Sequence, residues 1–188
     1  MELMQIKDRK DQYYEQFVHL YQTSFPPEEQ NPLSVMFHLS KKHKFFIYAI
    51  VDNDTFIGLV VIACGKKWNL LNYLAIEPSL QGKGYGSKIC QLIQQKYKDK
   101  PLVIEVEQNK SDDPNNEKQR RLDFYIRNHF TYSKLATSLY GVSYELLTNK
   151  TPLTYREYLE MYVEIFGSIK VKFLKIFPIE SMKKDSDL

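Results

Sequence analysis

Cysteine, tryptophan and an excess of charge of one sign are all scarce in this sequence. Its 188 residues include 2 cysteines and 1 tryptophan, and 26 lysines and arginines nearly balance 23 aspartates and glutamates. Cys64 lies in a strand-like run and Cys90 on the apolar side of a predicted helix, so a disulfide framework is not supported. We expect buried thiols in a reducing compartment, and therefore a cytoplasmic protein.

The sequence also lacks the features that nucleic-acid, membrane or metal binding would require. The net charge of +3 is spread along the chain and is too small to predict nucleic-acid binding. No stretch approaches about 18 uncharged apolar residues, and the N-terminus lacks a basic region followed by an apolar run, so we predict no membrane contact. His19, His38 and His43 lack partners at metal-ligand spacing, so we predict no metal.

Apolar periodicity predicts strands and helices along most of the chain. Strands are predicted at residues 2–7, 44–51, 56–64, 68–76, 102–107, 131–134 and 138–147, and helices at residues 12–24, 33–41, 87–97 and 117–128. This order, in a chain of 188 residues that is 43% apolar, predicts one α+β domain over residues 1–148.

A C-terminal extension, residues 149–188, follows this domain. It is predicted to contain an amphipathic helix over residues 154–166, a short strand and a charged, disordered tail from Ser181. The apolar stripe of the helix is predicted from Tyr155, Tyr158, Leu159, Tyr162 and Phe166. The strand is predicted from Ile169, Val171 and Phe173. We expect the helix to pack on its own chain, which leaves a monomer or a homodimer.

One connection between a strand and a helix has the composition of an anion site. Residues 81–86 read Gln-Gly-Lys-Gly-Tyr-Gly, which places three glycines within six residues. Without Cβ atoms, such a backbone bends tightly and directs several N–H groups toward one point. The helix that follows adds unpaired N–H groups and the positive end of its dipole, which suit a pyrophosphate.

The element order and three motifs resemble the GNAT superfamily of acyl-CoA-dependent N-acyltransferases. The turn Gln81–Gly86 matches the family's Gln/Arg-x-x-Gly-x-Gly/Ala signature, Ile76-Glu77-Pro78 its strand exit, and Phe124-Tyr125 before Asn128-His129-Phe130 its helix ending. The resemblance covers residues 1 to about 148. It implies a three-layer α/β arrangement, in which a mixed, mostly antiparallel central sheet is flanked by helices.

The resemblance also implies that acetyl-CoA is the co-substrate. The backbone of Leu74 and Ile76 would pair with the pantetheine arm, Gln81 would steady the turn, and amides of the turn would hold the pyrophosphate. Lys118 replaces a common cofactor-contacting asparagine, for which Asn115 or Asn116 could substitute. The implied cofactor-binding residues are Leu74, Ile76, Gln81, Gly82, Lys83, Gly84, Tyr85, Gly86, Ser87 and Asn116.

Two residues are candidates for proton transfer. Tyr125 matches the family's thiolate-protonating tyrosine, although a core tyrosine on an amphipathic helix would have the same spacing. Glu107, near the end of its strand, is the candidate base; alternatively, Glu105 and Glu107 are solvated or paired with Arg120 and Arg121. His129 replaces a glycine of the family, so this turn is expected either to be looser or to require a positive φ at the histidine.

These features predict an N-acetyltransferase that moves an acetyl group from acetyl-CoA to a primary amine of a small molecule or peptide, by direct attack in a ternary complex. A non-catalytic acyl-CoA-binding regulatory module is the alternative, favoured by the departures at Lys118 and His129. A phosphotransferase ranks third, because Gly86 is followed by Ser87-Lys88 rather than by Lys-Ser/Thr. We expect acceptor selection in the loop over residues 26–32, which contains Glu28 and Glu29.

Overall fold

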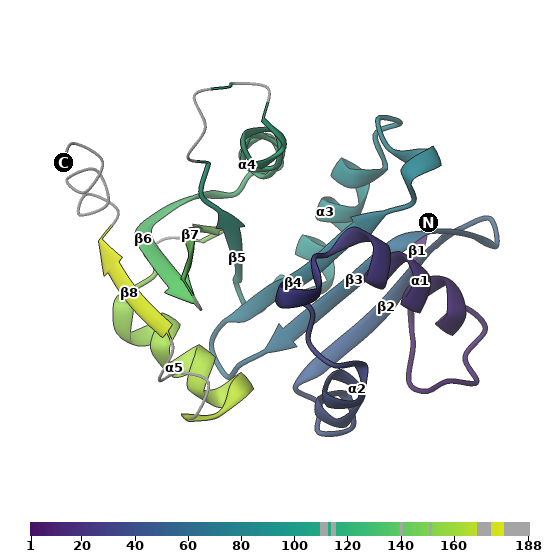
Figure 1. Ribbon diagram of the computed structural model, residues 1–188, viewed down its shortest axis with the longest axis horizontal. Helices are drawn as coiled ribbons and strands as arrows, with labels where there is room; N and C mark the ends of the chain where they lie inside the picture. Colours follow the sequence, from purple (N-terminus) through teal and green to yellow (C-terminus); the bar gives the residue numbers. More distant parts are fainter. Residues whose placement is uncertain (110–112, 114–115, 140, 151, 169–173, 179–188) are drawn as a thin grey trace. The chain divides into compact units, whose positions relative to one another are not determined.

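The computed structural model describes residues 1–109, 113, 116–139, 141–150, 152–168 and 174–178, which form eight strands and five α-helices (Figure 1). The strands are β1 (Glu2–Gln5), β2 (Phe45–Asp52), β3 (Thr55–Cys64), β4 (Asn69–Ile76), β5 (Leu102–Glu107), β6 (Thr131–Leu139), β7 (Val142–Thr148) and β8 (Leu174–Pro178). The helices are α1 (Tyr14–Ser24), α2 (Leu33–Lys41), α3 (Tyr85–Lys96), α4 (Glu117–Arg127) and α5 (Tyr155–Phe166), with 3-10 turns η1 (Pro27–Glu29) and η2 (Pro78–Leu80).

Backbone hydrogen bonds connect the strands in the order β1-β2-β3-β4-β5-β7-β6-β8. The pairs β1–β2, β2–β3, β5–β7, β6–β7 and β6–β8 are antiparallel, whereas β4 and β5 run parallel. The predicted α+β fold, with a mixed, mostly antiparallel sheet flanked by helices, is confirmed.

The chain divides into two compact units. The first consists of Met1–Cys64 and Leu71–Lys96, and the second of Gly65–Leu70 and Tyr97–Leu188. Strand β4 therefore begins in the second unit, where Asn69 pairs with Leu102 and Leu70 with Val103, and continues in the first.

The first unit has its core in strands β2 and β3. Both strands are buried along nearly their whole length, as is expected when both faces of a sheet are covered. The turn between them is formed by Asn53 and Asp54, with φ of 47° and 59°, which is the left-handed pair that a tight two-residue hairpin requires. Helix α2 packs on β2 and helix α1 on β3. The strands predicted at residues 44–51 and 56–64 therefore form an antiparallel hairpin.

Strands β3 and β4 approach each other closely at Gly58. A Cβ atom at this position would lie 2.2 Å from the carbonyl oxygen of Ala75, a separation that side chains do not tolerate. Nearby, the N–H of Glu77 donates to the carbonyl of Ile57 over 2.9 Å. The absence of a side chain at residue 58 thus sets the distance between these strands.

The second unit is held together partly by α5. Thr154 and Glu157 form a capping box at its start, and the buried residues of the helix are Tyr158, Met161, Tyr162 and Ile165. The predicted apolar stripe was wrong at Tyr155, which is 51% exposed, because this residue lies in the first helical turn beyond the packed face. Sequence spacing alone did not distinguish the two faces of this aromatic-rich helix.

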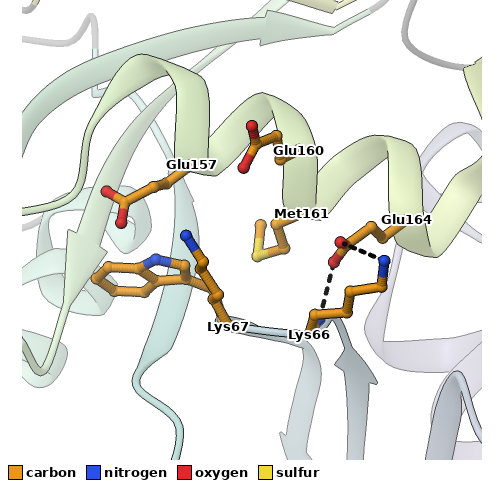
Figure 2. Close-up of a pocket in the computed structure, with 7 residues that line it drawn as sticks. Lys66, Lys67, Glu157, Glu160, Met161 and Glu164 are labelled. Atoms are coloured by element: carbon orange, nitrogen blue, oxygen red, sulfur yellow. Dashed lines mark hydrogen bonds and ion pairs between the residues drawn. The ribbon is translucent and has the colours of Figure 1, made fainter.

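Helix α5 also holds the connection between β3 and β4. Figure 2 shows Glu164 facing Lys66: its carboxylate accepts the Lys66 backbone N–H over 2.8 Å and lies 3.7 Å from the Lys66 ammonium. A small hollow beside this contact is lined by Lys66, Lys67, Trp68, Glu157, Glu160, Met161 and Glu164. None of the predicted site residues lines this hollow.

The end of the chain differs from the prediction in two places. Strand β6 does not end at residue 134 but continues to Leu139, because Lys134 adopts a φ of 67° within a register shift between Tyr132 and Ala136. The strand predicted at residues 138–147 begins only at Val142, as β7, after a turn that contains Gly141 with a φ of 86°. The strand predicted from Ile169, Val171 and Phe173 and the tail from Ser181 lie outside the described residues.

Candidate active site

The turn after β4 has the backbone geometry of an anion site. Gly82 and Gly84 have φ of 75° and 81°, in the left-handed region that favours glycine, and both are exposed. Gly86 instead lies within α3 and is buried. Two of the three glycines therefore shape the turn, and the third is buried in the first turn of the helix.

Helix α3 starts at Tyr85, directly after these glycines. The Lys88 N–H donates to the Gly84 carbonyl over 3.4 Å, so the N–H groups of Tyr85, Gly86 and Ser87 precede the first bond of the helix and have no acceptor within it. These donors and the positive end of the helix dipole face the exposed turn. Lys83 is exposed beside them, and the Lys88 ammonium lies 5.8 Å from the ring centre of Tyr85.

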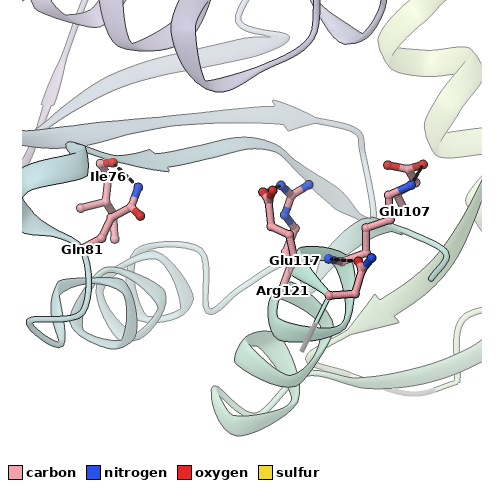
Figure 3. Close-up of polar contacts among 7 residues, drawn as sticks. Ile76, Gln81, Glu107, Glu117 and Arg121 are labelled. Carbon is pink, nitrogen blue, oxygen red and sulfur yellow. Dashed lines mark hydrogen bonds and ion pairs between the residues drawn. The ribbon is translucent and has the colours of Figure 1, made fainter. Parts of the chain in front are cut away.

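Gln81 connects this turn to the strand before it. Its Nε2 donates to the Ile76 carbonyl over 3.1 Å (Figure 3). The next peptide N–H, that of Glu77, points to Ile57 on β3, and the C=O and N–H of one trans peptide unit point in opposite directions. The Ile76 carbonyl therefore points away from β3. Leu74 and Ile76 are half-buried on this strand.

Asn116 begins the candidate residues of the second unit. It is the N-cap of α4, where its Oδ1 accepts the Lys118 backbone N–H over 2.8 Å. Asn115, the other predicted substitute for the family's asparagine, lies outside the described residues. The Asn116 oxygen is thus engaged in capping, and its amide nitrogen is the group left for another contact.

Tyr125 is buried near the end of α4, with 7% of its surface exposed. Its ring packs edge-on against Phe130 at 5.9 Å, and its carbonyl accepts N–H groups from Asn128 and Phe130 over 3.0 and 3.1 Å. His129 has a φ of 68°, so of the two alternatives expected for this turn the structure has the positive φ. The helix ending therefore fixes the backbone on which Tyr125 is carried.

The two carboxylates at the end of β5 have different partners. Glu107, which is labelled in Figure 3, is ion-paired with Lys118, and Glu105 accepts a hydrogen bond from the Tyr158 hydroxyl. Burial and the Glu105 charge raise the pKa of Tyr158 well above its ordinary value, so the phenol stays protonated as a donor. The expected pairing with arginine does not hold for Arg121, which binds Glu117 over 2.9 Å.

Sequence reasoning missed both of these partners. Lys118 lies 11 residues from Glu107 and Tyr158 lies 53 residues from Glu105. A charge pairing across the loop before α4 was a usable signal for Lys118, because both residues adjoin that loop. No local pattern could have connected Tyr158 to Glu105.

Cys90 does not have the character of a nucleophile. Burial raises the pKa of the Cys90 thiol to about 12, so this thiol is protonated at neutral pH. Cys64, at the end of β3, is half-buried, and neither cysteine forms a disulfide. Among the described residues, no group of three or more histidine, cysteine, aspartate or glutamate side chains is placed to hold a metal ion.

Comparisons with known proteins address the family of this chain. Residues 42–132 match the model of the "Acetyltransferase (GNAT) domain". The chain is 31% identical over 93 residues to the "Putative acetyltransferase YjbC" of Bacillus subtilis (strain 168), a match that covers 50% of this chain and 39% of that relative. The match thus spans about two fifths of the relative's length.

Solved structures share the fold at low sequence identity. A "Putative acetyltransferase from GNAT family" of Bacteroides thetaiotaomicron superposes with a TM-score of 0.72 at 23% identity, over 89% of this chain and 99% of that one. A GNAT family acetyltransferase of Elizabethkingia anophelis, solved with acetyl-CoA bound, has a TM-score of 0.56 at 14% identity, over 80% and 97%.

A helix that spans a membrane must be both long and apolar. In the part of the chain that the structure describes, no helix combines the length and the apolarity needed to cross a bilayer. Residues 42–132 thus match the model of the GNAT acetyltransferase domain, and the chain shares the fold of solved structures described as GNAT acetyltransferases.

Proposed function

We propose that the protein is an acetyl-CoA-dependent N-acetyltransferase that acetylates a primary amine of a small molecule or peptide. The observation that carries this proposal is the turn at residues 81–87, where two glycines with positive φ and the start of α3 present backbone N–H groups to solvent. Such a turn suits a pyrophosphate, and it lies inside the segment that matches the GNAT domain.

The cofactor is assigned to the strand and turn of the first unit. The backbone groups of Leu74 and Ile76 would pair with the pantetheine arm as an added strand would, and Gln81 would keep the Ile76 carbonyl in place. The amides of residues 82–87 would bind the pyrophosphate, with Lys83 adding positive charge. From the second unit, the Asn116 amide nitrogen is assigned to the cofactor, since its oxygen caps α4.

The reaction requires no covalent intermediate on the protein. The neutral amine attacks the thioester carbonyl, the C–N bond forms, and collapse of the tetrahedral intermediate breaks the C–S bond. We assign Tyr125 to give its proton to the leaving thiolate, because a phenol and a thiol have comparable basicity. Glu107 is assigned to accept the amine proton, through its oxygens or a water molecule. The protonated Cys90 is consistent with direct attack.

Binding and turnover together test this proposal. Isothermal titration with CoA and with ATP, followed by detection of free thiol from acetyl-CoA in the presence of an amine panel, separates the three candidate functions. We expect CoA to bind, ATP not to compete, and at least one amine to release thiol. CoA binding without turnover on any amine would select the regulatory module, which Lys118 and His129 favour. ATP competition would select the phosphotransferase.

The remaining assignments concern the whole chain. We propose residues 1–148 as the acyltransferase domain and residues 149–188 as an extension of it, although α5 packs within the second unit. A cytoplasmic location agrees with two cysteines that form no disulfide. Light scattering of the purified protein distinguishes the monomer from the homodimer.

A further inference from the structure

The Tyr73 hydroxyl joins strand β4 to the loop between α1 and α2. It accepts the Asn31 backbone N–H over 3.0 Å and the Asn31 Nδ2 over 2.8 Å, and it donates to the Glu29 carbonyl over 2.7 Å. The phenol thus acts as donor and as acceptor toward residues of this loop. This hydroxyl is therefore committed to the loop and is not a proton source for a bound molecule.

Further contacts hold the same loop from the helix before it. The Tyr21 hydroxyl of α1 donates to the Asn31 carbonyl over 3.1 Å, and Gln30 Nε2 donates to the Phe25 carbonyl over 2.6 Å. Burial raises the pKa values of both Tyr21 and Tyr73, so both phenols keep their protons and remain donors.

Aromatic packing completes the attachment. The Tyr73 ring lies edge-on to the rings of Tyr21 and Phe25, with ring centres 4.9 and 4.8 Å apart. Tyr73 and Tyr21 are 6% and 1% exposed, so the anchor is almost fully buried. By contrast, Glu28 at the tip of the loop is exposed. The loop thus has a rigid base and an accessible acidic tip.

The position of Tyr73 along β4 determines which part of a bound cofactor would lie beside the loop. If the pyrophosphate binds at residues 82–87 and the pantetheine arm lies along the strand, the arm runs from Ile76 back to Leu74. Successive strand residues are about 3.3 Å apart, so the acyl end of the cofactor comes to the level of Tyr73. Residues 29–31 are bonded to the strand at that same level.

We propose that Tyr73 is a positioning residue that holds the loop over residues 26–32 as a preformed wall beside the thioester, where the acceptor amine binds. This inference rests on the proposed acetyltransferase function and assigns it a residue that sets acceptor affinity rather than cofactor affinity. Preformation matters because an ordered loop does not have to be immobilised when the acceptor binds.

Tyr73→Phe tests the proposal, with Tyr13→Phe as the matched control. Tyr13 is also a buried tyrosine of the first unit, 5% exposed, but its hydroxyl donates to the Asp54 carbonyl in the distant hairpin turn. Hydrogen exchange followed by mass spectrometry or NMR is the first readout. We expect the Asn31 amide of the Tyr73→Phe protein to exchange about tenfold faster, as loss of one buried hydrogen bond predicts, and that of Tyr13→Phe not to change.

Steady-state kinetics is the second readout, with an amine that the wild-type protein acetylates. We expect Tyr73→Phe to raise the acceptor KM about five- to tenfold, while the Kd for CoA from titration stays within about twofold and Tyr13→Phe changes neither value. Faster exchange at Asn31 with an unchanged acceptor KM would overturn the acceptor role, and unchanged exchange would overturn the anchor itself. The exchange measurement needs no turnover, so failure of the proposed function is seen separately, as an absence of thiol release in the wild-type protein.

Discussion

The turn at residues 81–87 offers mainly backbone groups, whereas the end of strand β5 offers side chains held by partners from other elements. In the turn, Gly82 and Gly84 set the conformation and the donors are peptide N–H groups. At the end of β5, Glu107 depends on Lys118 of α4, and Glu105 depends on Tyr158 of α5.

The two regions therefore respond to different changes. A backbone site is insensitive to the loss of a side chain but sensitive to the addition of one, because an added Cβ disfavours positive φ. A side-chain site loses its chemistry when a single functional group is removed. The substitutions below test this difference between the two regions.

Removal of the Tyr125 hydroxyl is expected to have the largest effect. Tyr125→Phe keeps the ring and its packing on Phe130 but removes the proton assigned to the thiolate, so kcat should fall about 100-fold, the low end for a lost general acid. Stopped-flow or thiol-release kinetics measures this loss, with the Kd for CoA as the control. Equal activity of the variant would remove Tyr125 from the mechanism.

A side chain in the turn should weaken cofactor binding next most strongly. Gly84→Val forces a β-branched residue to φ of 81°, which costs about 1–3 kcal/mol and should raise the Kd for CoA about tenfold or more. Gly167→Val is the matched control, because Gly167 has φ of 82° after α5. If both variants lose the same affinity, the effect comes from general destabilisation and not from the turn.

Substitutions of the two carboxylates of β5 should have different effects on kcat. Glu107→Gln removes the assigned base and should lower kcat about tenfold or more, whereas Glu105→Gln keeps an oxygen that can accept from Tyr158 and should lower it about twofold or less. Steady-state rates of the two variants at saturating acetyl-CoA and acceptor measure the difference. A larger loss for Glu105→Gln would reverse the assignment.

Substitution of Glu145 should have the smallest effect, and this effect should be on stability rather than on the reaction rate. Burial raises its pKa, and its Oε2 is buried without a hydrogen-bond partner among the described residues. A raised native pKa favours the protonated form, so its stabilisation is present below the unfolded pKa and is lost as pH rises through the native pKa.

Glu145→Gln cannot ionise and should therefore be more stable than the wild type near pH 7.5, with a Tm higher by about 1–2 °C, and equal to it near pH 4. Scanning calorimetry at the two pH values provides the comparison. A Tm difference of the same size at both pH values would show that the burial of charge is not its cause.

The same contrast explains what could be predicted from the sequence. Glycine reports local backbone conformation, so the turn at residues 81–87 could be located in advance. The Tyr158 contact with Glu105 spans 53 residues and depends on how α5 packs. The positive φ of Lys134 has no local sequence signal either, which is why β6 was predicted to end too early.

Residue 58 shows how a position that touches no ligand can still decide whether a ligand binds. Any substitution there would push Ala75 and Ile76 away from β3, and with them the carbonyl that Gln81 uses to hold the turn. A mutational scan of activity would then mark Gly58 as strongly as Gly84, although the first sets a distance between strands and the second a dihedral angle. Comparing the folded yield of each variant with its affinity for CoA would reveal the difference.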